Sequence, residues 1–182
     1  MDHTRLSKEI AFALRHDPWQ YELELDDEGF VPVGQLLDAI NGEGKYDRRI
    51  TEDDIRHIMD ISDKQRFELR DGMIRAYYGH TVPGRIRKEA AKPPPILYHG
   101  TSHKAIPLIK EQGLLPMQRQ YVHLSADTEM AQRVGRRRDP SPVILTIDTR
   151  AAAARGVVFY IGNDRVWLCE RIAPELISGF PE

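Results

Sequence analysis

The sequence predicts an α+β protein of two lobes, a helical lobe followed by one rich in strands. Amphipathic helical patterns and one hairpin pattern fill residues 1–82, and short runs of β-branched and aromatic residues recur from residue 96 onward. The stretch between them, 83–95, ends in three consecutive prolines, which join neither a helix nor a central strand. We therefore expect two domains, 1–82 and 96–182, with 83–95 as a linker.

Three helices are expected in the first lobe. Apolar residues within 6–14 fall on one helical face, and Asp17-Pro18 ends that helix because the residue before a proline avoids helical geometry. A second apolar stripe covers residues 33–40. Thr51 and Asp54 have the spacing of a capping box and predict the start of a third helix.

A β-hairpin is expected after these helices. Phe67 and Leu69 alternate with charged residues, and Asp71-Gly72 is a typical two-residue turn into the run 73–77. Three helices followed by a hairpin indicate a winged-helix lobe.

The second lobe is predicted to be built from short strands. Helices are expected near 103–112 and 127–134, ended by Gly113 and Gly135. Because the strands are short and separated by loops, we expect split mixed or antiparallel sheets and not a doubly wound one. The predicted strands are 96–98, 121–124, 143–147, 157–160 and 166–169.

Charge is distributed unevenly between the two halves. Residues 1–82 contain 11 Lys and Arg against 18 Asp and Glu, a net −7, whereas residues 83–182 contain 15 against 10, a net +5. A generic DNA-binding surface is basic, so the first lobe is a poor candidate for one, and any nucleic acid there must bind at a local site. The basic half is the better candidate for holding a diphosphate.

The remaining bulk features indicate a cytoplasmic protein without membrane contact. Cys169 is the single cysteine, so no internal disulfide forms. No apolar run approaches the ~20 residues of a membrane span, and no apolar signal region follows the N-terminus. No cluster has metal-ligand spacing, and no apolar stripe is left over for a partner, so we expect a monomer without a metal site.

Polar residues stand in short blocks along the whole chain. A guanidinium group matches phosphate oxygens and keeps its charge, so arginines from several blocks suit a phosphate dianion if the two lobes face each other. Taken singly, each of these residues is typical of a surface or core position. The blocks are Arg15-His16, Lys64-Gln65-Arg66-Phe67, Tyr98-His99-Gly100-Thr101 and Arg119-x-x-Val122-His123-Leu124-Ser125.

The order and spacing of these blocks resemble the NAD-dependent RNA 2′-phosphotransferases, a family known for tRNA 2′-phosphotransferase activity. The resemblance extends from about Leu6 to about Leu176. It implies a winged-helix first lobe and a second lobe with the ADP-ribosyltransferase fold. Three further blocks contribute to it: Arg75-Ala76-x-x-Gly79-His80, Val134-Gly135-x-Arg137 and Val166-Trp167-Leu168.

The resemblance also implies a reaction in two steps. The RNA 2′-phosphate attacks the nicotinamide ribose of NAD and expels nicotinamide, which leaves an ADP-ribosylated RNA 2′-phosphate. The ribose 2″-hydroxyl then attacks that phosphate, and the products are 2′-hydroxyl RNA and ADP-ribose 1″,2″-cyclic phosphate. A phosphate dianion needs no general base for the first step. Histidine is the side chain that ordinarily transfers protons near neutral pH, so His16 is expected to act in the second step.

Site residues follow from the same resemblance. Glycine at 100 is expected to let the backbone approach the nicotinamide amide closely. One of the four arginines in 133–138 is expected to neutralise the NAD pyrophosphate. The partners implied are 2′-phosphorylated RNA of the tRNA splice-junction type and NAD as co-substrate. The expected catalytic residues are Arg15, His16, Arg66 and Arg119; the cofactor residues are His99, Gly100, Thr101, His123, Leu124, Ser125, Gly135, Arg136 and Val166; and the RNA-binding residues are Lys64, Arg75 and His80.

The chain departs from the family pattern at four places, which include Tyr121, where a histidine is frequent, and residues 134–139, which lack the common Arg-His-Gly. Tyr77-Tyr78 replaces a common Asn-Gln, and Asn163-Asp164-Arg165 lengthens the turn before Val166. Two other functions remain open: an ADP-ribosyltransferase that leaves its modification on a nucleic-acid end or a protein, and a non-catalytic winged-helix nucleic-acid binder. The acidic first lobe argues against the binder.

Overall fold

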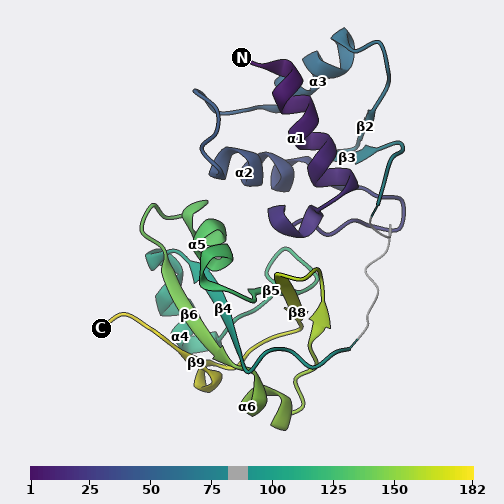
Figure 1. Ribbon diagram of the computed structural model, residues 1–182. Helices are drawn as coiled ribbons and strands as arrows, with labels where there is room; N and C mark the ends of the chain where they lie inside the picture. The colour runs from purple at the N-terminus through teal and green to yellow at the C-terminus, as the bar shows by residue number, and fades with distance from the viewer. Residues whose placement is uncertain (82–89) are drawn as a thin grey trace. The chain divides into compact units, whose positions relative to one another are not determined.

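The chain forms two compact units, residues 1–87 and 88–182, in a computed structural model that describes residues 1–81 and 90–182 (Figure 1). Most of the predicted linker, 83–89, lies outside the described residues. Residues 90–95 are fastened to the second unit: the Ala91 N–H donates to the Phe159 carbonyl at 3.0 Å, and the Thr149 hydroxyl donates to the Pro94 carbonyl at 2.5 Å.

The first unit contains three α-helices and a small antiparallel sheet, and the helices and hairpin predicted from the sequence are present. The strand order in the sheet is β1-β3-β2. The elements are α1 (His3–Arg15), the 3-10 helix η1 (Pro18–Tyr21), β1 (Val31–Pro32), α2 (Val33–Gly42), α3 (Glu52–Ile61), β2 (Phe67–Arg70) and β3 (Met73–Ala76).

Local chemistry explains where the helices of this unit begin. The Asp2 carboxylate accepts the Arg5 backbone N–H at 2.9 Å and caps α1. The predicted capping box is confirmed at α3, where Asp54 also accepts the Thr51 N–H at 2.8 Å. The predicted apolar stripes form one core, which includes the fully buried Leu6, Ile10, Leu14, Leu36, Ile40 and Ile55.

The second unit is a six-stranded antiparallel sheet with helices on both faces, which confirms the α+β class. The strand order is β7-β8-β5-β4-β6-β9, and no parallel pair occurs among the described residues. The elements are β4 (Ile96–Thr101), η2 (His103–Ala105), α4 (Ile106–Gln112), β5 (Val122–Ser125), α5 (Thr128–Arg136), β6 (Val143–Asp148), α6 (Thr149–Ala154), β7 (Tyr160–Ile161), β8 (Val166–Cys169), η3 (Pro174–Leu176) and β9 (Ile177–Ser178).

The middle of this sheet is its weakest junction. Six residue pairs join β4 to β6, but only Tyr98 and Ser125 pair between β4 and β5. The sheet is therefore close to two three-stranded halves that meet at one position. Helix α5 covers the face of β4 that carries Gly100, and α4 packs in the core on the other face (Figure 1).

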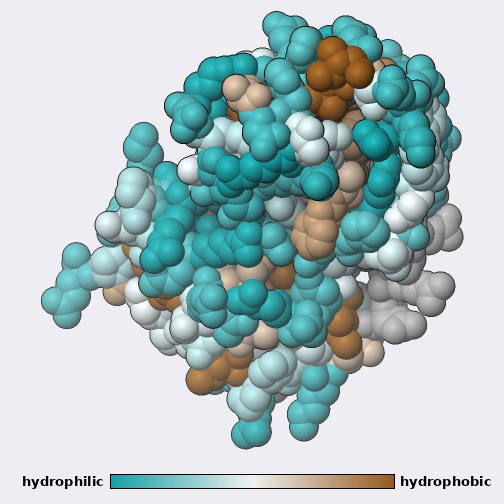
Figure 2. Space-filling view, turned by 45° about the horizontal axis from the view of Figure 1, so that its top comes forward, coloured by the Kyte–Doolittle hydropathy of each residue, from teal (hydrophilic) through white to brown (hydrophobic). Residues whose placement is uncertain are grey.

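Exposed apolar side chains are scattered over the surface. On the face drawn in Figure 2, hydrophilic residues predominate and hydrophobic ones form small separate patches. Single exposed apolar residues of this kind are normal for a folded protein. None of the described helices combines the length and the apolar character that a membrane crossing requires.

Candidate phosphate-binding site

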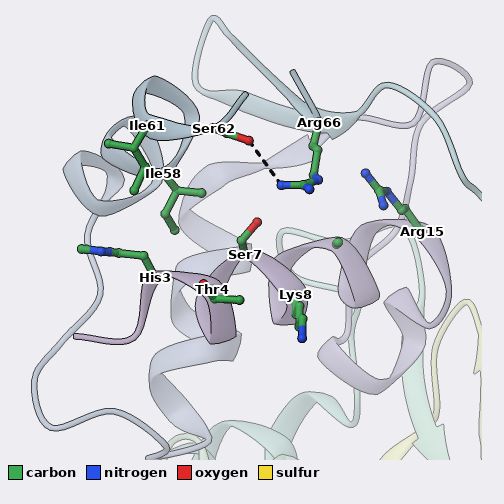
Figure 3. A pocket seen from close by; sticks show the side chains of 10 residues that line it. His3, Thr4, Ser7, Lys8, Arg15, Ile58, Ile61, Ser62 and Arg66 are labelled. Atoms are coloured by element: carbon green, nitrogen blue, oxygen red, sulfur yellow. Dashed lines mark hydrogen bonds between the residues drawn. The ribbon is translucent and has the colours of Figure 1, made fainter. Parts of the chain in front are cut away.

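A pocket of about 370 Å³ lies in the first unit, between α1 and the C-terminal end of α3 (Figure 3). Thr4, Lys8, Ala11 and Arg15 line it from α1, and their spacing of three or four residues places them on one helical face. The opposite wall comes from the end of α3 and the segment that follows it. The residues of this second wall are Ile58, Ile61, Ser62 and Arg66, and His3 and Ser7 complete the lining.

Arg15, which lines this pocket, also carries unsatisfied hydrogen-bond donors. Its Nε and Nη2 atoms are shielded from solvent, and neither has a hydrogen-bond partner within residues 1–81 and 90–182. A buried donor without an acceptor costs about 1–3 kcal/mol, and more when the group is charged. An anion that reached these two donors would remove that cost, which favours an anionic ligand at Arg15.

The segment that follows β3 braces Arg15 from one side. The ring of Tyr78 lies over the guanidinium, with Cζ 4.9 Å from the ring centroid. Gly79 has φ +84°, and a Cβ atom there would lie only 3.3 Å from Arg15 Cδ, so the position favours glycine for both reasons. The Thr81 N–H donates to the Arg15 carbonyl at 2.8 Å and so satisfies one of the last carbonyls of α1.

Two histidines lie near the Arg15 end of the pocket. His16 is exposed, and its Nδ1 forms a 3.0 Å hydrogen bond with the Thr81 hydroxyl. The pKa of His80 lies below its ordinary value because its ring is partly desolvated and because Arg15, His16 and Arg75 are close to it. These neighbours show that positive charge gathers here, although the unit as a whole is acidic.

Arg66 lines the same pocket as Arg15, which confirms that these two blocks meet. Arg66 is half-buried, its Nη1 donates to Ser62 Oγ at 3.2 Å, and both guanidinium groups lie at the same end of the pocket (Figure 3). Arg119 belongs to the second unit, where its backbone N–H donates to the Pro116 carbonyl at 3.1 Å. Its convergence with the other two arginines stays a prediction.

The residues predicted to bind RNA lie in different surroundings. Lys64 is exposed in the loop between α3 and β2. Arg75 is engaged within the first unit: its Nε and Nη2 both lie 2.6 Å from Glu68 Oε2, and its Nη1 donates to the Glu28 carbonyl at 3.2 Å. This pairing neutralises the charge of Arg75, so its surroundings favour a structural role.

Seven of the nine predicted cofactor residues lie on the three adjacent strands β4, β5 and β8, and the other two, Gly135 and Arg136, lie on α5. Ser125 pairs with Tyr98 on one side and with Val166 on the other, so these side chains share one face of the sheet, as does His123 two residues earlier. Leu124 points to the opposite face and is 1% exposed in the core. Ser125, His123 and Thr101 are buried polar residues.

His99 bridges the weak junction of the sheet. Its Nδ1 lies 3.1 Å from the carbonyl oxygen of His123. Because a carbonyl oxygen only accepts hydrogen bonds, Nδ1 carries the hydrogen in this contact. The contact joins β4 to β5 where the backbone ladder has a single pair.

Gly100 lies where helix α5 meets the sheet. A Cβ atom at residue 100 would lie 1.8 Å from the carbonyl oxygen of Ala131, and one at Gly135 would lie 2.5 Å from Cβ of Pro142. In the structure, the close approach that requires glycine at 100 is therefore made by a helix. The expected approach of nicotinamide to the same backbone stays a prediction.

Charged residues lie at both ends of α5. Asp127 caps its N-terminus by accepting the Met130 N–H at 2.7 Å, and it also accepts two hydrogen bonds from Arg165, at 3.0 and 3.1 Å. Arg165 thus ties the lengthened turn before β8 to α5, and it lowers the pKa of Asp127. Arg136 is exposed at the C-terminal end of the helix.

Comparison with known proteins identifies the family of this chain. A family model described as "RNA 2'-phosphotransferase, Tpt1 / KptA family" matches residues 1–171. The chain belongs to this family.

Relatives of the same family match nearly the whole chain. A protein of Acetivibrio thermocellus is 49% identical over 177 residues, which cover 97% of each chain, and one of Bacillus thuringiensis subsp. konkukian is 47% identical over 176 residues, which cover 97% of this chain and 95% of the relative. A protein of Pyrococcus horikoshii is 38% identical over 96% of this chain and 97% of its own. All three carry the name "Probable RNA 2'-phosphotransferase".

Some residues of the pocket in this RNA 2′-phosphotransferase family member were not identified from the sequence. Lys8 could have been predicted as a neighbour of Arg15, because it precedes Arg15 by two helical turns and so lies on the same face of the helix. Ser62 was not identified although its partner Arg66 is only four residues away. Tyr78 and Thr81, which contact Arg15 from outside the pocket lining, gave no signal because Arg15 is remote from them in the sequence.

Proposed function

We propose that this chain removes a 2′-phosphate from RNA by transferring it to NAD, with 2′-hydroxyl RNA, nicotinamide and ADP-ribose 1″,2″-cyclic phosphate as products. The proposal rests on Arg15, whose buried donors meet no acceptor among the described residues and which shares its pocket with Arg66. Membership of the RNA 2′-phosphotransferase family supplies the class of reaction.

The two arginines have complementary roles in this proposal. Arg15 donates from Nε and Nη2 to two phosphate oxygens, the fork geometry that suits an oxyanion. Arg66 adds a second guanidinium from the other wall, and Arg119 is proposed to add a third. Hydrogen bonds to charged groups contribute roughly 1.5–3 kcal/mol each, and they strengthen as charge builds on the phosphoryl oxygens.

His16 is proposed to move a proton when the RNA 2′-oxygen leaves. That oxygen must leave as a hydroxyl, so a nearby acid is needed in the second step. His16 follows Arg15 directly, and its bond to the Thr81 hydroxyl orients the ring. In this proposal the exposed imidazole of His16 reaches the phosphate that Arg15 holds.

NAD is proposed to bind to the second unit. When bound it supplies an electrophilic ribose carbon with nicotinamide as the leaving group. The chemistry of the candidate residues is compatible with such a ligand: Ser125 offers a hydroxyl group on one face of the sheet, Thr101 and His99 offer hydrogen-bonding groups on the neighbouring strand, and Arg136 offers a cation for a diphosphate. In this proposal the first unit is a winged-helix lobe and the second has the ADP-ribosyltransferase fold.

The test is to incubate the full chain with NAD and an oligonucleotide that carries one internal 2′-phosphate. We expect 2′-hydroxyl oligonucleotide and ADP-ribose 1″,2″-cyclic phosphate in equal amounts. Arg15→Ala is expected to abolish turnover, whereas Arg56→Ala, which removes an exposed arginine of α3 paired with Glu52, is expected to leave it unchanged.

Other results would support the other candidate functions. A stable ADP-ribosylated oligonucleotide or protein without cyclic phosphate would indicate an ADP-ribosyltransferase. No turnover, with equal affinity for unmodified DNA and 2′-phosphorylated RNA, would indicate a nucleic-acid binder.

A further inference from the structure

The pocket of the first unit has two chemically different ends. Arg15 and Arg66 lie at one end, and Ile58, Ile61 and His3 lie at the other (Figure 3). Ser7 and Lys8 line the stretch of α1 between them. We call this elongated pocket the α1–α3 groove.

The α1–α3 groove is larger than a phosphate requires. A phosphate has five heavy atoms, and even at roughly 30 Å³ for each, the volume of a water molecule in the liquid, it fills at most about 150 Å³. The groove holds about 370 Å³, so more than half of it remains for another part of the ligand. A volume of this size is typical of sites for small organic ligands.

The far end of the groove suits an apolar and flat group. Ile61 is 57% exposed although it is a large hydrophobic residue, and Ile58 beside it is 4% exposed and forms the floor. The His3 ring lies against the His57 ring at a centroid distance of 4.7 Å, which holds an aromatic surface at the same end. Nucleobases stack on surfaces of this kind without sequence preference.

The length of the groove indicates which base would reach this end. His3 and Arg15 are the first and last residues of the 13-residue helix α1, so their backbones are about 18 Å apart at 1.5 Å per residue. The Arg15 side chain leans toward the helix N-terminus and shortens the gap only in part. A phosphate and the ribose that bears it do not fill such a distance, whereas a neighbouring nucleotide of the same strand extends along it.

We infer that the α1–α3 groove binds the nucleoside adjacent to the 2′-phosphorylated ribose, with its base on Ile61 and Ile58. This inference rests on the proposed function, because it takes the RNA 2′-phosphate to be the anion at Arg15. It assigns the apolar half of the groove to substrate RNA. The enzyme then distinguishes an internal 2′-phosphate in a strand from the same phosphate on an isolated nucleotide.

The experiment uses three 2′-phosphorylated oligonucleotides: one intact, one abasic at the 5′ neighbour and one abasic at the 3′ neighbour. With the unmodified enzyme we expect one abasic site to raise KM roughly fivefold to tenfold with little change in kcat, the effect of uncovering about half of an isoleucine side chain. Ile61→Ser is expected to raise KM for the intact oligonucleotide by a similar factor.

The decisive result is the combination of the two changes. If the missing base is the one that packs on Ile61, combining the abasic oligonucleotide with Ile61→Ser raises KM no more than either change alone. Leu108→Ser is the matched control, since Leu108 is a 43% exposed leucine of α4 in the second unit. In Leu108→Ser the abasic site is expected to raise KM by the same factor as in the unmodified enzyme.

Two outcomes would overturn the inference. The first is that neither the 5′ nor the 3′ abasic site changes KM. The second is that the increases in KM caused by Ile61→Ser and by the abasic site multiply when the two changes are combined. Failure of the proposed function would look different, because then even the intact oligonucleotide is not turned over. In that case the affinities of the parent and the Ile61→Ser variant for the intact and the abasic oligonucleotide are compared by fluorescence anisotropy. If the two losses of affinity multiply, the groove is again rejected as a base site.

Discussion

A methyl group at residue 100 tests how the second unit is packed. In Gly100→Ala the new Cβ would lie 1.8 Å from the carbonyl oxygen of Ala131, far inside the 3.4–4 Å of ordinary van der Waals contact. The obstacle is helix backbone, so no side-chain rotation relieves it. Helix α5 must therefore move away from β4 by more than 1 Å, or the strand must bend.

The expected cost has two parts. Forcing extra volume into a well-packed interior typically costs about 1–3 kcal/mol. A displaced α5 also uncovers part of Met130 and Val134, now 2% and 7% exposed, and full burial of such side chains contributes about 1.5–3 kcal/mol each. We expect the free energy of unfolding of the second unit to fall by about 3 kcal/mol or more.

The assay is urea unfolding followed by tryptophan fluorescence. The chain has two tryptophans, Trp19 in the first unit and Trp167 in the second, so a Trp19→Phe background makes the emission report on the second unit. Gly34→Ala in α2 of the first unit is the control, followed through Trp19 in a Trp167→Phe background, because a Cβ there meets no atom within 4 Å and alanine favours a helix by about 0.5–1 kcal/mol. A Gly100→Ala chain that unfolds within about 0.5 kcal/mol of its parent would refute the reasoning.

Three further predictions concern single side chains. The hydrogen bond from Arg48 holds the pKa of the buried Asp54 carboxyl well below its usual range, so Asp54 takes up a proton more readily in the unfolded chain than in the folded one. The free energy of unfolding of the first unit should therefore fall as the pH drops below roughly 4. Asp54→Asn should remove this dependence in urea titrations across that range. Asp127→Ala should destabilise the second unit by about 1–2 kcal/mol in thermal or urea unfolding, since α5 loses its N-cap, whereas Asp127→Asn should retain most of the stability. His16→Asn should release nicotinamide but accumulate ADP-ribosylated RNA, detected by mass spectrometry, and turnover at the parental rate would contradict the assigned proton transfer.

Much of the first unit follows from local rules. The hairpin turn was predicted from Asp71-Gly72, and both residues have positive φ, 52° and 75°, as a tight two-residue turn requires. The capping box at Thr51 likewise depends on residues three apart. Such features are encoded within a few residues, so a single sequence reveals them.

Short elements and paired charges were harder to predict. Strands β1 and β9 have two residues each, too few to show any alternation, and they exist because β3 and β6 offer free edges. Arg75 was expected to contact RNA because of the block in which it stands. In the structure Glu68, opposite it on the neighbouring strand, engages its guanidinium, and only the register of the hairpin decides this pairing. The contact of Arg75 with RNA stays a prediction.

The sequence alone determined the class of the fold, the family and the two arginines that line one pocket, because hydrophobic periodicity and the order of the polar blocks are read directly from the residues. Tertiary structure decided what surrounds those arginines. Thr81 bonds to His16 across 65 residues of chain, Tyr78 covers the Arg15 guanidinium, and two donors of Arg15 are left buried without an acceptor among the described residues. Contacts of this kind arise from packing between distant elements, and no local pattern of residues encodes them.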